Sequence, residues 1–290
     1  MIGMSSTWMA IKGFGIRESI ERCFDLGFEL VEVGAGHKYE PDAVGSVIQT
    51  KQKYPGKHFT VHAFFPPLTK SYAMNMSDPK EHAIIIKTAE GMFDLAKRIG
   101  ADVVGMHGGY AGEVMWVPDR GGFEKLEIKK PIPPEVAEAN MMSVLQKLVK
   151  LAESRGVKLA MEISPFDESK PILSDIESFE KVFSGIRSKS LGMLLDVGHL
   201  HVSAAAKGFD PYEFTARFRD RIFELHLHDY KDDNKHIAVG TGEIDFDKYF
   251  KIIGKPFLKR IPMVFEYNNS VTEEQALAGK VLIEDIMREI

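Results

Sequence analysis

Cysteine is nearly absent from this sequence. Its 290 residues include one cysteine, Cys23, which excludes an internal disulfide and a cysteine-based zinc site. No apolar run approaches the roughly 18 residues that a membrane-spanning helix needs, and the first residues lack the basic start and apolar stretch of a signal peptide. These absences predict a cytoplasmic protein with no membrane partner.

An excess of positive charge is also missing. The chain has 37 lysines and arginines against 42 aspartates and glutamates, a formal net charge of -5. A strongly basic field is the usual electrostatic footprint of nucleic-acid binding, so its absence weakly disfavours DNA or RNA as a partner. The sequence also has no glycine-rich dinucleotide fingerprint after its first predicted strand.

The sequence does contain a regular alternation of short apolar runs and longer amphipathic segments. Eight runs are typical of buried strands: residues 2–7, 28–34, 58–64, 102–108, 157–163, 191–197, 222–229 and 261–267. Helices are predicted over residues 16–26, 77–99, 133–154, 174–183, 211–219, 246–253 and 272–287. Gly100 and Gly156 each follow a predicted helix and precede a strand, as glycines that end helices do.

Strands that alternate with helices indicate parallel pairing with right-handed crossovers, and eight such units close into a (β/α)₈ TIM barrel. We therefore predict an α/β protein with one barrel domain over residues 1–290, with an open doubly wound sheet as the alternative. One connection is unusually long. Residues 108–132 separate the fourth strand from its helix, and we predict that this segment is a loop that acts as a lid or a binding loop.

Polar residues recur at or near the C-terminal ends of these strands, where barrel enzymes place their active sites. In chain order they are Glu32, His62, His107, Glu162, Asp196, His226 and Glu266. Glu162, Asp196 and Glu266 would repel one another at one barrel mouth, and a divalent cation would turn that repulsion into binding. Three oxygen donors and the imidazole of His226 suit Mn²⁺, Mg²⁺, Co²⁺ or Zn²⁺. The alternative for each residue is a helix cap or a pair with an arginine.

Further histidines extend this candidate centre. They are His62, His107, His199 and His236. Their number predicts either one metal ion or a multinuclear zinc site in which Glu162 bridges two ions. His228 lies two residues after His226, so both imidazoles point to the same face of the strand. We predict that His228 contacts a substrate oxygen or a metal ligand.

Six motifs, in this order along the chain, resemble the strand-end motifs of the xylose-isomerase-like TIM barrels. They are FTVHAFF, VGMHGG, AMEIS, LLDVGH, ELHLHD with HIAVGTGEID, and VFEYN. The resemblance spans about residues 28–267. This superfamily holds sugar and sugar-phosphate isomerases and epimerases, and also the endonuclease IV type of AP endonuclease (family 2). The motifs are specific for the superfamily but fit either branch.

In the isomerase and epimerase branch, the resemblance implies a quartet that binds one ion, Zn²⁺ or Mn²⁺. The matching residues are Glu162, Asp196, His226 and Glu266. The metal would polarise the carbonyl of a small carbohydrate or sugar phosphate, and Glu162 and Glu266 would be the catalytic acid and base. His199, His228 and Glu32 are the expected substrate-binding residues. Barrels of this kind often pair, so a homodimer is expected.

In the endonuclease IV branch, the resemblance implies three zinc ions and an abasic site in DNA as the substrate. The ligand sets would be His62, His107 and Glu162 for the first ion, the quartet for the second, and His199 and His236 for the third. The third ion would also need an Asp where this chain has Asn234, although Asp232 and Asp233 are close by. The segment GAGHKYEPD has few basic or aromatic residues to grip DNA, so the isomerase or epimerase interpretation is favoured.

Overall fold

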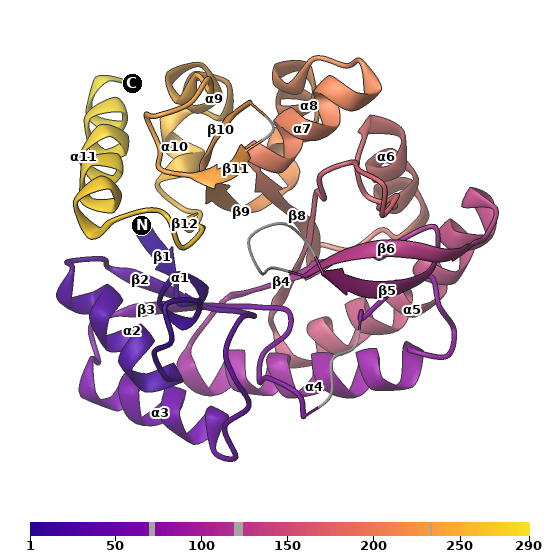
Figure 1. Cartoon of the computed structure of the whole chain (residues 1–290), viewed down its shortest axis with the longest axis horizontal. Helices are drawn as coiled ribbons and strands as arrows, with labels where there is room; N and C mark the ends of the chain where they lie inside the picture. Colours follow the sequence, from indigo (N-terminus) through magenta and orange to yellow (C-terminus); the bar gives the residue numbers. More distant parts are fainter. Residues whose placement is uncertain (70–72, 119–123, 233) are drawn as a thin grey trace.

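The computed structural model describes residues 1–69, 73–118, 124–232 and 234–290, without the side chains of residues 118, 124, 125 and 234. Eight strands close into a barrel in the order β1-β12-β9-β8-β7-β4-β3-β2, and the helices surround it (Figure 1). The barrel strands are β1 (Ile2–Ser5), β2 (Leu30–Val33), β3 (His58–His62), β4 (Val103–His107), β7 (Lys158–Glu162), β8 (Leu191–Asp196), β9 (Ile222–Leu227) and β12 (Met263–Phe265). All neighbouring pairs are parallel, which confirms the predicted TIM barrel.

Helices follow the strands much as the amphipathic pattern predicts. They are α1 (Thr7–Ala10), α2 (Ile16–Asp25), α3 (Ala43–Lys53), α4 (His82–Ile99), α5 (Pro134–Arg155), α6 (Ile176–Gly185), α7 (Val197–Lys207), α8 (Pro211–Phe218), α9 (Phe246–Ile253), α10 (Lys255–Leu258) and α11 (Glu273–Glu289), with a 3₁₀ turn η2 (Arg219–Arg221). Gly100 and Gly156 end α4 and α5 with φ of 71° and 69°, the left-handed conformation that glycine adopts without a steric cost. Among the described residues, no helix is both long and apolar enough to cross a bilayer.

Several segments differ from the sequence-based expectation, including α3 and α7, which none of the predicted helices covers. The connection after β4, predicted as a loop, contains an antiparallel hairpin of β5 (Gly112–Pro118) and β6 (Glu124–Pro131). The β-branched and aromatic residues of this segment favour strands, and the pairing satisfies their backbone groups. A second hairpin, β10 (Asp229–Lys231) with β11 (Asn234–Ile237), follows β9. The helix expected from residue 77 begins at His82, because the Asp78 carboxylate accepts a hydrogen bond from the Lys80 N–H and forms a turn first.

Inside the barrel, the side chains change from apolar to polar along the strands. Val103, Ala160 and Leu194 form a small apolar cluster of their own. Two residues further along β7 and β8, on the same face, stand Glu162 and Asp196. The apolar cluster therefore supports the charged groups from below and leaves them at the C-terminal mouth of the barrel.

Candidate metal centre

Glu162 ends β7, and its carboxylate lies among three imidazoles. Oε2 is 2.8 Å from His62 Nε2 and 3.2 Å from His107 Nδ1, and Oε1 is 3.0 Å from His199 Nδ1. Burial alone would raise the pKa of this carboxyl, but the three imidazoles outweigh burial and hold the pKa well below its usual range. Glu162 is therefore ionised, and it joins the histidines at the ends of β3 and β4 to the histidine in the first turn of α7.

His226, on β9, has its two ring nitrogens in different surroundings. Nε2 lies 2.9 Å from Glu32 Oε2, a hydrogen bond in which the imidazole donates. Nδ1 lies 3.4 Å from Glu266 Oε2 and 3.8 Å from Asp196 Oδ2, yet it has no hydrogen-bond partner among the described residues. Burial would lower the pKa of His226, but Glu32 and Glu266 outweigh it and raise the pKa well above its usual value. The Nδ1 position thus attracts positive charge, which a proton or a metal ion can supply.

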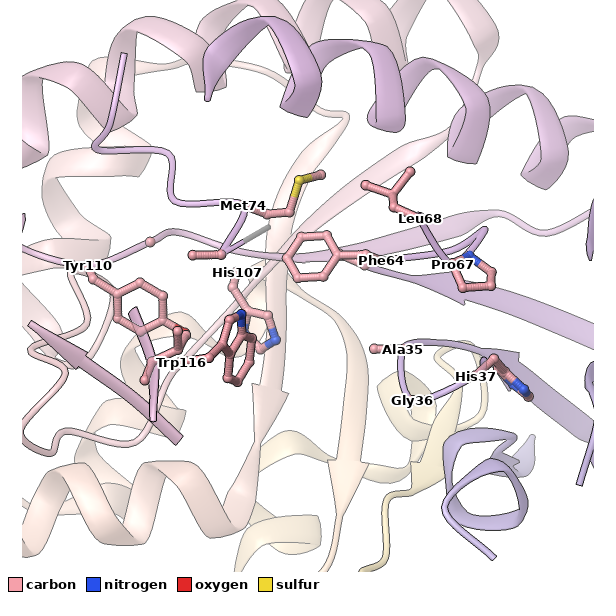
Figure 2. A pocket seen from close by; sticks show the side chains of 14 residues that line it. Ala35, Gly36, His37, Phe64, Pro67, Leu68, Met74, His107, Tyr110 and Trp116 are labelled. Carbon is pink, nitrogen blue, oxygen red and sulfur yellow. The ribbon is translucent and has the colours of Figure 1, made fainter. Parts of the chain in front are cut away.

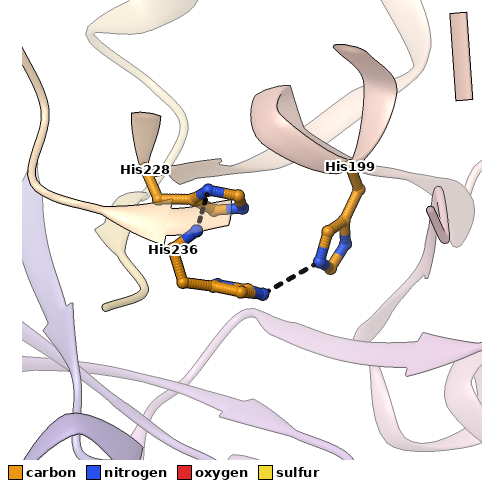
Figure 3. Close-up of side chains that lie close together, drawn as sticks. All are labelled: His199, His228 and His236. Atoms are coloured by element: carbon orange, nitrogen blue, oxygen red, sulfur yellow. Dashed lines mark hydrogen bonds between the residues drawn. The ribbon is translucent and has the colours of Figure 1, made fainter. Parts of the chain in front are cut away.

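His62 and His236 repeat this arrangement. His62 Nδ1 is 2.8 Å from the Ala63 carbonyl oxygen, and His236 Nδ1 is 3.1 Å from that of Glu266. A carbonyl can only accept, so each Nδ1 carries a hydrogen and each Nε2 faces the other side of the ring. His62 Nε2 lies 2.8 Å from Glu162 Oε2 and donates to this ionised carboxylate, and His236 Nε2 lies 3.1 Å from His199 Nε2 (Figure 3). One nitrogen held by a protein oxygen and the other turned toward further donors is the arrangement of metal-ligating histidines.

Asp196 is held in place by two groups of the protein. It caps α7, because its Oδ1 accepts a hydrogen bond of 2.6 Å from the His199 backbone N–H. His228 Nδ1 accepts the backbone N–H of His236 at 2.8 Å, so its Nε2 carries the hydrogen and donates to Asp196 Oδ1 at 2.9 Å. Burial would raise the pKa of Asp196, but His199 and His228 lower it to about 2. Asp196 therefore has two positions at once: it caps helix α7, and it belongs with Glu162 to one group of potential metal ligands.

The potential ligand atoms fall into overlapping groups, and within each group they lie no more than 4.8 Å apart. The groups are Glu162, Asp196, His226 and Glu266 (the quartet); His62, His107 and Glu162; His199, His228 and His236; and Glu32, Glu224 and His226. Every residue that the sequence predicted for the site occurs in one of them. The donor set of the quartet, three carboxylates and one imidazole with a bare lone pair, fits a divalent ion such as Mn²⁺ or Zn²⁺.

Three predicted details need separate mention. Glu32, expected to bind substrate, is completely buried, and its carboxylate contacts the far nitrogen of His226. His228, expected to contact a substrate oxygen or a metal ligand, is completely buried, and its Nε2 lies 2.9 Å from Oδ1 of Asp196, a candidate metal ligand. Both side chains therefore face protein groups. Of the acidic residues near the third ligand set, Asp232 is exposed, whereas Asp233 lies outside the described residues, as does the side chain of Asn234.

Two acidic residues of this region escaped the sequence reasoning. Glu224 precedes His226 by two residues on the same face of β9, and it is completely buried. Burial raises its pKa most, and the nearby Glu32 raises it further, to about 8. The spacing of two residues between Glu224 and His226 could have predicted that both side chains point into the barrel. Asp229 follows His228 and fixes the loop that carries His236. Its carboxylate accepts hydrogen bonds of 2.8–3.1 Å from the backbone N–H groups of Tyr230, Gly240, Gly242 and Ile244.

A closed parallel barrel whose mouth collects carboxylates and imidazoles defines a TIM-barrel protein with a candidate metal centre. The model of one family, described as "Xylose isomerase-like TIM barrel", matches residues 20–284. The chain therefore belongs to the xylose isomerase-like TIM barrel family, which confirms the resemblance drawn from the strand-end motifs.

Relatives from this family carry different names. An uncharacterized protein of Methanocaldococcus jannaschii is 26% identical over 259 residues, 83% of this chain and 79% of the relative. A ketose 3-epimerase of Arthrobacter globiformis is 23% identical over 260 residues, 89% and 79% of the two chains. A probable endonuclease 4 of Carboxydothermus hydrogenoformans is 22% identical over 273 residues, 88% and 85% of the two chains. Both predicted branches are thus found among the relatives.

Solved structures share the fold at low sequence identity. A D-tagatose 3-epimerase-like protein aligns with a TM-score of 0.74 at 20% identity, over 99% of this chain and 97% of the other. The IolI protein with a bound zinc atom aligns with a TM-score of 0.70 at 18% identity, over 99% and 98% of the chains. At these identities the likeness establishes the barrel fold.

Proposed function

We propose that this protein is a divalent-metal-dependent isomerase or epimerase of sugars or sugar phosphates. The observation that carries the proposal is the environment of His226. Its Nε2 is held by Glu32, and its bare Nδ1 faces the carboxylates of Asp196 and Glu266. A buried imidazole nitrogen beside the carboxylates of Asp196 and Glu266 is costly unless a cation or a proton joins them. The likeness to a ketose 3-epimerase and to a zinc-containing barrel supports the same conclusion.

The metal would be held by Glu162, Asp196, His226 and Glu266. When bound, a divalent ion supplies polarisation of a substrate carbonyl, which acidifies the neighbouring carbon. Glu162 ends β7 and Glu266 follows β12, and the barrel places β8 and β9 between these strands. The two carboxylates therefore reach a substrate from different sides. One glutamate removes the proton beside the carbonyl, and the other returns a proton to the opposite face and so inverts that carbon.

Exchange of this carbon-bound proton gives a direct test. The protein is incubated in D₂O with Mn²⁺ and a panel of ketoses, and deuterium next to the carbonyl is followed by NMR. We expect incorporation together with a second epimer, sensitive to chelator and unaffected by Glu18→Gln, a change at an exposed glutamate on α2. Deuterium incorporation that ignores chelators would contradict the proposal.

A second candidate function is a zinc-dependent phosphodiesterase of the endonuclease IV type. The observation that favours it is the presence of three further ligand groups beside the quartet, of which one shares Glu162 and another shares His226. Such clusters let several metal ions activate a water and stabilise a leaving oxygen. A probable endonuclease 4 among the relatives is consistent with it.

Metal analysis of the purified protein separates the two functions. One tightly held ion that Mn²⁺ can replace supports the sugar enzyme, and a content near three zinc ions supports the phosphodiesterase. A duplex with one abasic site provides the activity assay for the second case. Efficient metal-dependent nicking without any deuterium exchange on sugars would replace the first function with the second.

A further inference from the structure

An open cavity of about 370 Å³ lies directly beside the candidate metal centre. It is bounded by the segments after β2, β3 and β4 and by the β5–β6 hairpin. His107 belongs to both places: its ring lines the cavity, and its Nδ1 is 3.2 Å from Glu162. His107 therefore connects the cavity with the ligand groups around Glu162.

The walls of this aromatic cavity are apolar. Phe64, Tyr110 and Trp116 contribute rings, and Figure 2 labels these three side chains together with His107 among the residues that line the cavity. Leu68, Met74 and Leu126 are among the aliphatic residues of the lining. Across the hairpin Trp116 is paired with Leu126, so both point to the same face of it. Trp116 is 40% exposed, an aromatic surface that a bound ring would cover.

Charged and polar groups of the lining are few. None of the described lining residues is a lysine or an arginine, so these residues offer a phosphate none of the cations that usually recognise it. His37 Nε2 is 2.9 Å from the Ser6 hydroxyl, whereas its Nδ1 has no partner among the described residues, and His107 Nδ1 faces Glu162. Sugar hydroxyls placed against the apolar and aromatic walls would lose water without gaining equivalent hydrogen bonds. The cavity suits a flat apolar group better than more sugar.

We propose that the natural substrate is an uncharged keto sugar that carries an aromatic aglycone, with its carbonyl at a ring carbon other than the anomeric carbon that holds the aglycone. The sugar binds at the quartet, and the aglycone occupies the aromatic cavity between Phe64 and Trp116. This inference rests on the proposed function, because it assigns the sugar to the metal. It narrows the substrate class from sugars and sugar phosphates to aryl-substituted neutral sugars.

Tryptophan fluorescence gives a test that needs no turnover. The chain has two tryptophans, and Trp8 is completely buried, so changes on ligand addition report on Trp116. Phenyl β-D-glucoside, methyl β-D-glucoside and glucose 6-phosphate are titrated into the Mn²⁺-loaded full chain, with calorimetry as the second readout. We expect the phenyl glucoside to bind at least about tenfold more tightly than the methyl glucoside, because its ring is buried.

Variants locate the binding. Trp116→Ala and Phe64→Ala should remove the preference for the phenyl glucoside in calorimetry. Met115→Ala is the matched control, since Met115 is the exposed neighbour of Trp116 and does not line the cavity. Equal binding of the phenyl and methyl glucosides, a preference for the phosphate, or a phenyl preference that survives Trp116→Ala would each overturn the proposal.

The two proposals can fail separately. Deuterium exchange on free ketoses without any phenyl preference would leave the proposed function standing and remove the aglycone. A phenyl preference that depends on Trp116, in a protein that exchanges no carbon-bound proton, would support the aromatic cavity and remove the proposed function.

Discussion

The candidate metal centre and the aromatic cavity meet at His107, but the side chains of the first are polar and those of the second are mostly apolar. The centre consists of carboxylates and imidazoles, most of them buried, at the ends of barrel strands and in the segments that directly follow them. The cavity consists of apolar side chains on the segments after β2, β3 and β4 and on a hairpin, and Trp116 is partly exposed there. Under the proposed function, this difference would separate two tasks. The strand ends would hold the groups that bind metal and move protons, whereas the added segments would determine which substrate fits.

The largest effect should come from the quartet. We expect the double variant Glu162→Gln/Glu266→Gln to lose bound metal and to reduce turnover by at least roughly 10²–10⁴-fold, because it removes both the acid/base pair and two ligands. Metal content and deuterium exchange measure the two losses. Glu18→Gln on α2 should change neither. A double variant that keeps its metal and its turnover would show that the centre lies elsewhere.

The second prediction concerns Glu32, whose carboxylate accepts a hydrogen bond from His226 Nε2, the ring nitrogen that does not face the quartet. Glu32→Gln keeps an oxygen for the His226 N–H but removes the charge, so metal affinity should fall roughly 10–100-fold. Competition with a chromogenic chelator measures this change. Glu29→Gln, at an exposed glutamate just before β2, should leave the affinity as it is. Equal affinities for Glu32→Gln and the wild type would indicate that His226 needs no such support.

At the edge of the cavity, His37 should make stability depend on pH. Burial lowers the pKa of His37 to about 4, below its ordinary value of 6.5. Between these two pH values the imidazole is protonated in the unfolded chain but neutral in the folded protein. The free energy of unfolding therefore falls as the pH falls. From about pH 7 to about pH 5, the wild type should lose ~2 kcal/mol more unfolding free energy than His37→Gln.

Urea denaturation at both pH values measures this difference. His58→Gln, at an exposed histidine, is the matched control and should follow the wild type. If the wild type and His37→Gln lose stability in parallel, His37 does not stay neutral in the folded protein.

The smallest effect should come from Trp116. Since its side chain is partly exposed on a hairpin outside the barrel, Trp116→Ala should change the unfolding free energy by no more than about 0.5 kcal/mol. Its metal content should equal that of the wild type. Thermal denaturation and metal analysis check both points. Loss of metal in this variant would mean that the cavity and the centre are one unit.

The sequence predicts the barrel well because periodicity and strand count are local properties. Alternating apolar runs mark each strand, and Gly100 and Gly156 mark helix ends. The hairpin after β4 was predicted as a loop, because its strands mix charged and apolar residues without one buried face. What packs against a strand is a tertiary property, and periodicity does not report it.

For the site, the sequence predicts which residues meet but not how each one is used. Strand ends converge in a barrel, so the sequence predicts that Glu162, Asp196 and His226 lie close together. That His228 donates to Asp196, and that Glu32 supports His226, depends on which ring nitrogen faces which oxygen. Such details follow from side-chain positions, which spacing along a strand leaves undetermined.

The carboxylate of Asp229 has a further consequence. By collecting four backbone N–H groups, it fastens the loop that carries His236 to the end of β9 while the chain folds. The conformational entropy of this loop is therefore lost when the chain folds, and it is not lost again when a ligand binds. An ion held with the help of His236 would therefore find this imidazole already in position, so preferred coordination geometry would influence which metal binds best.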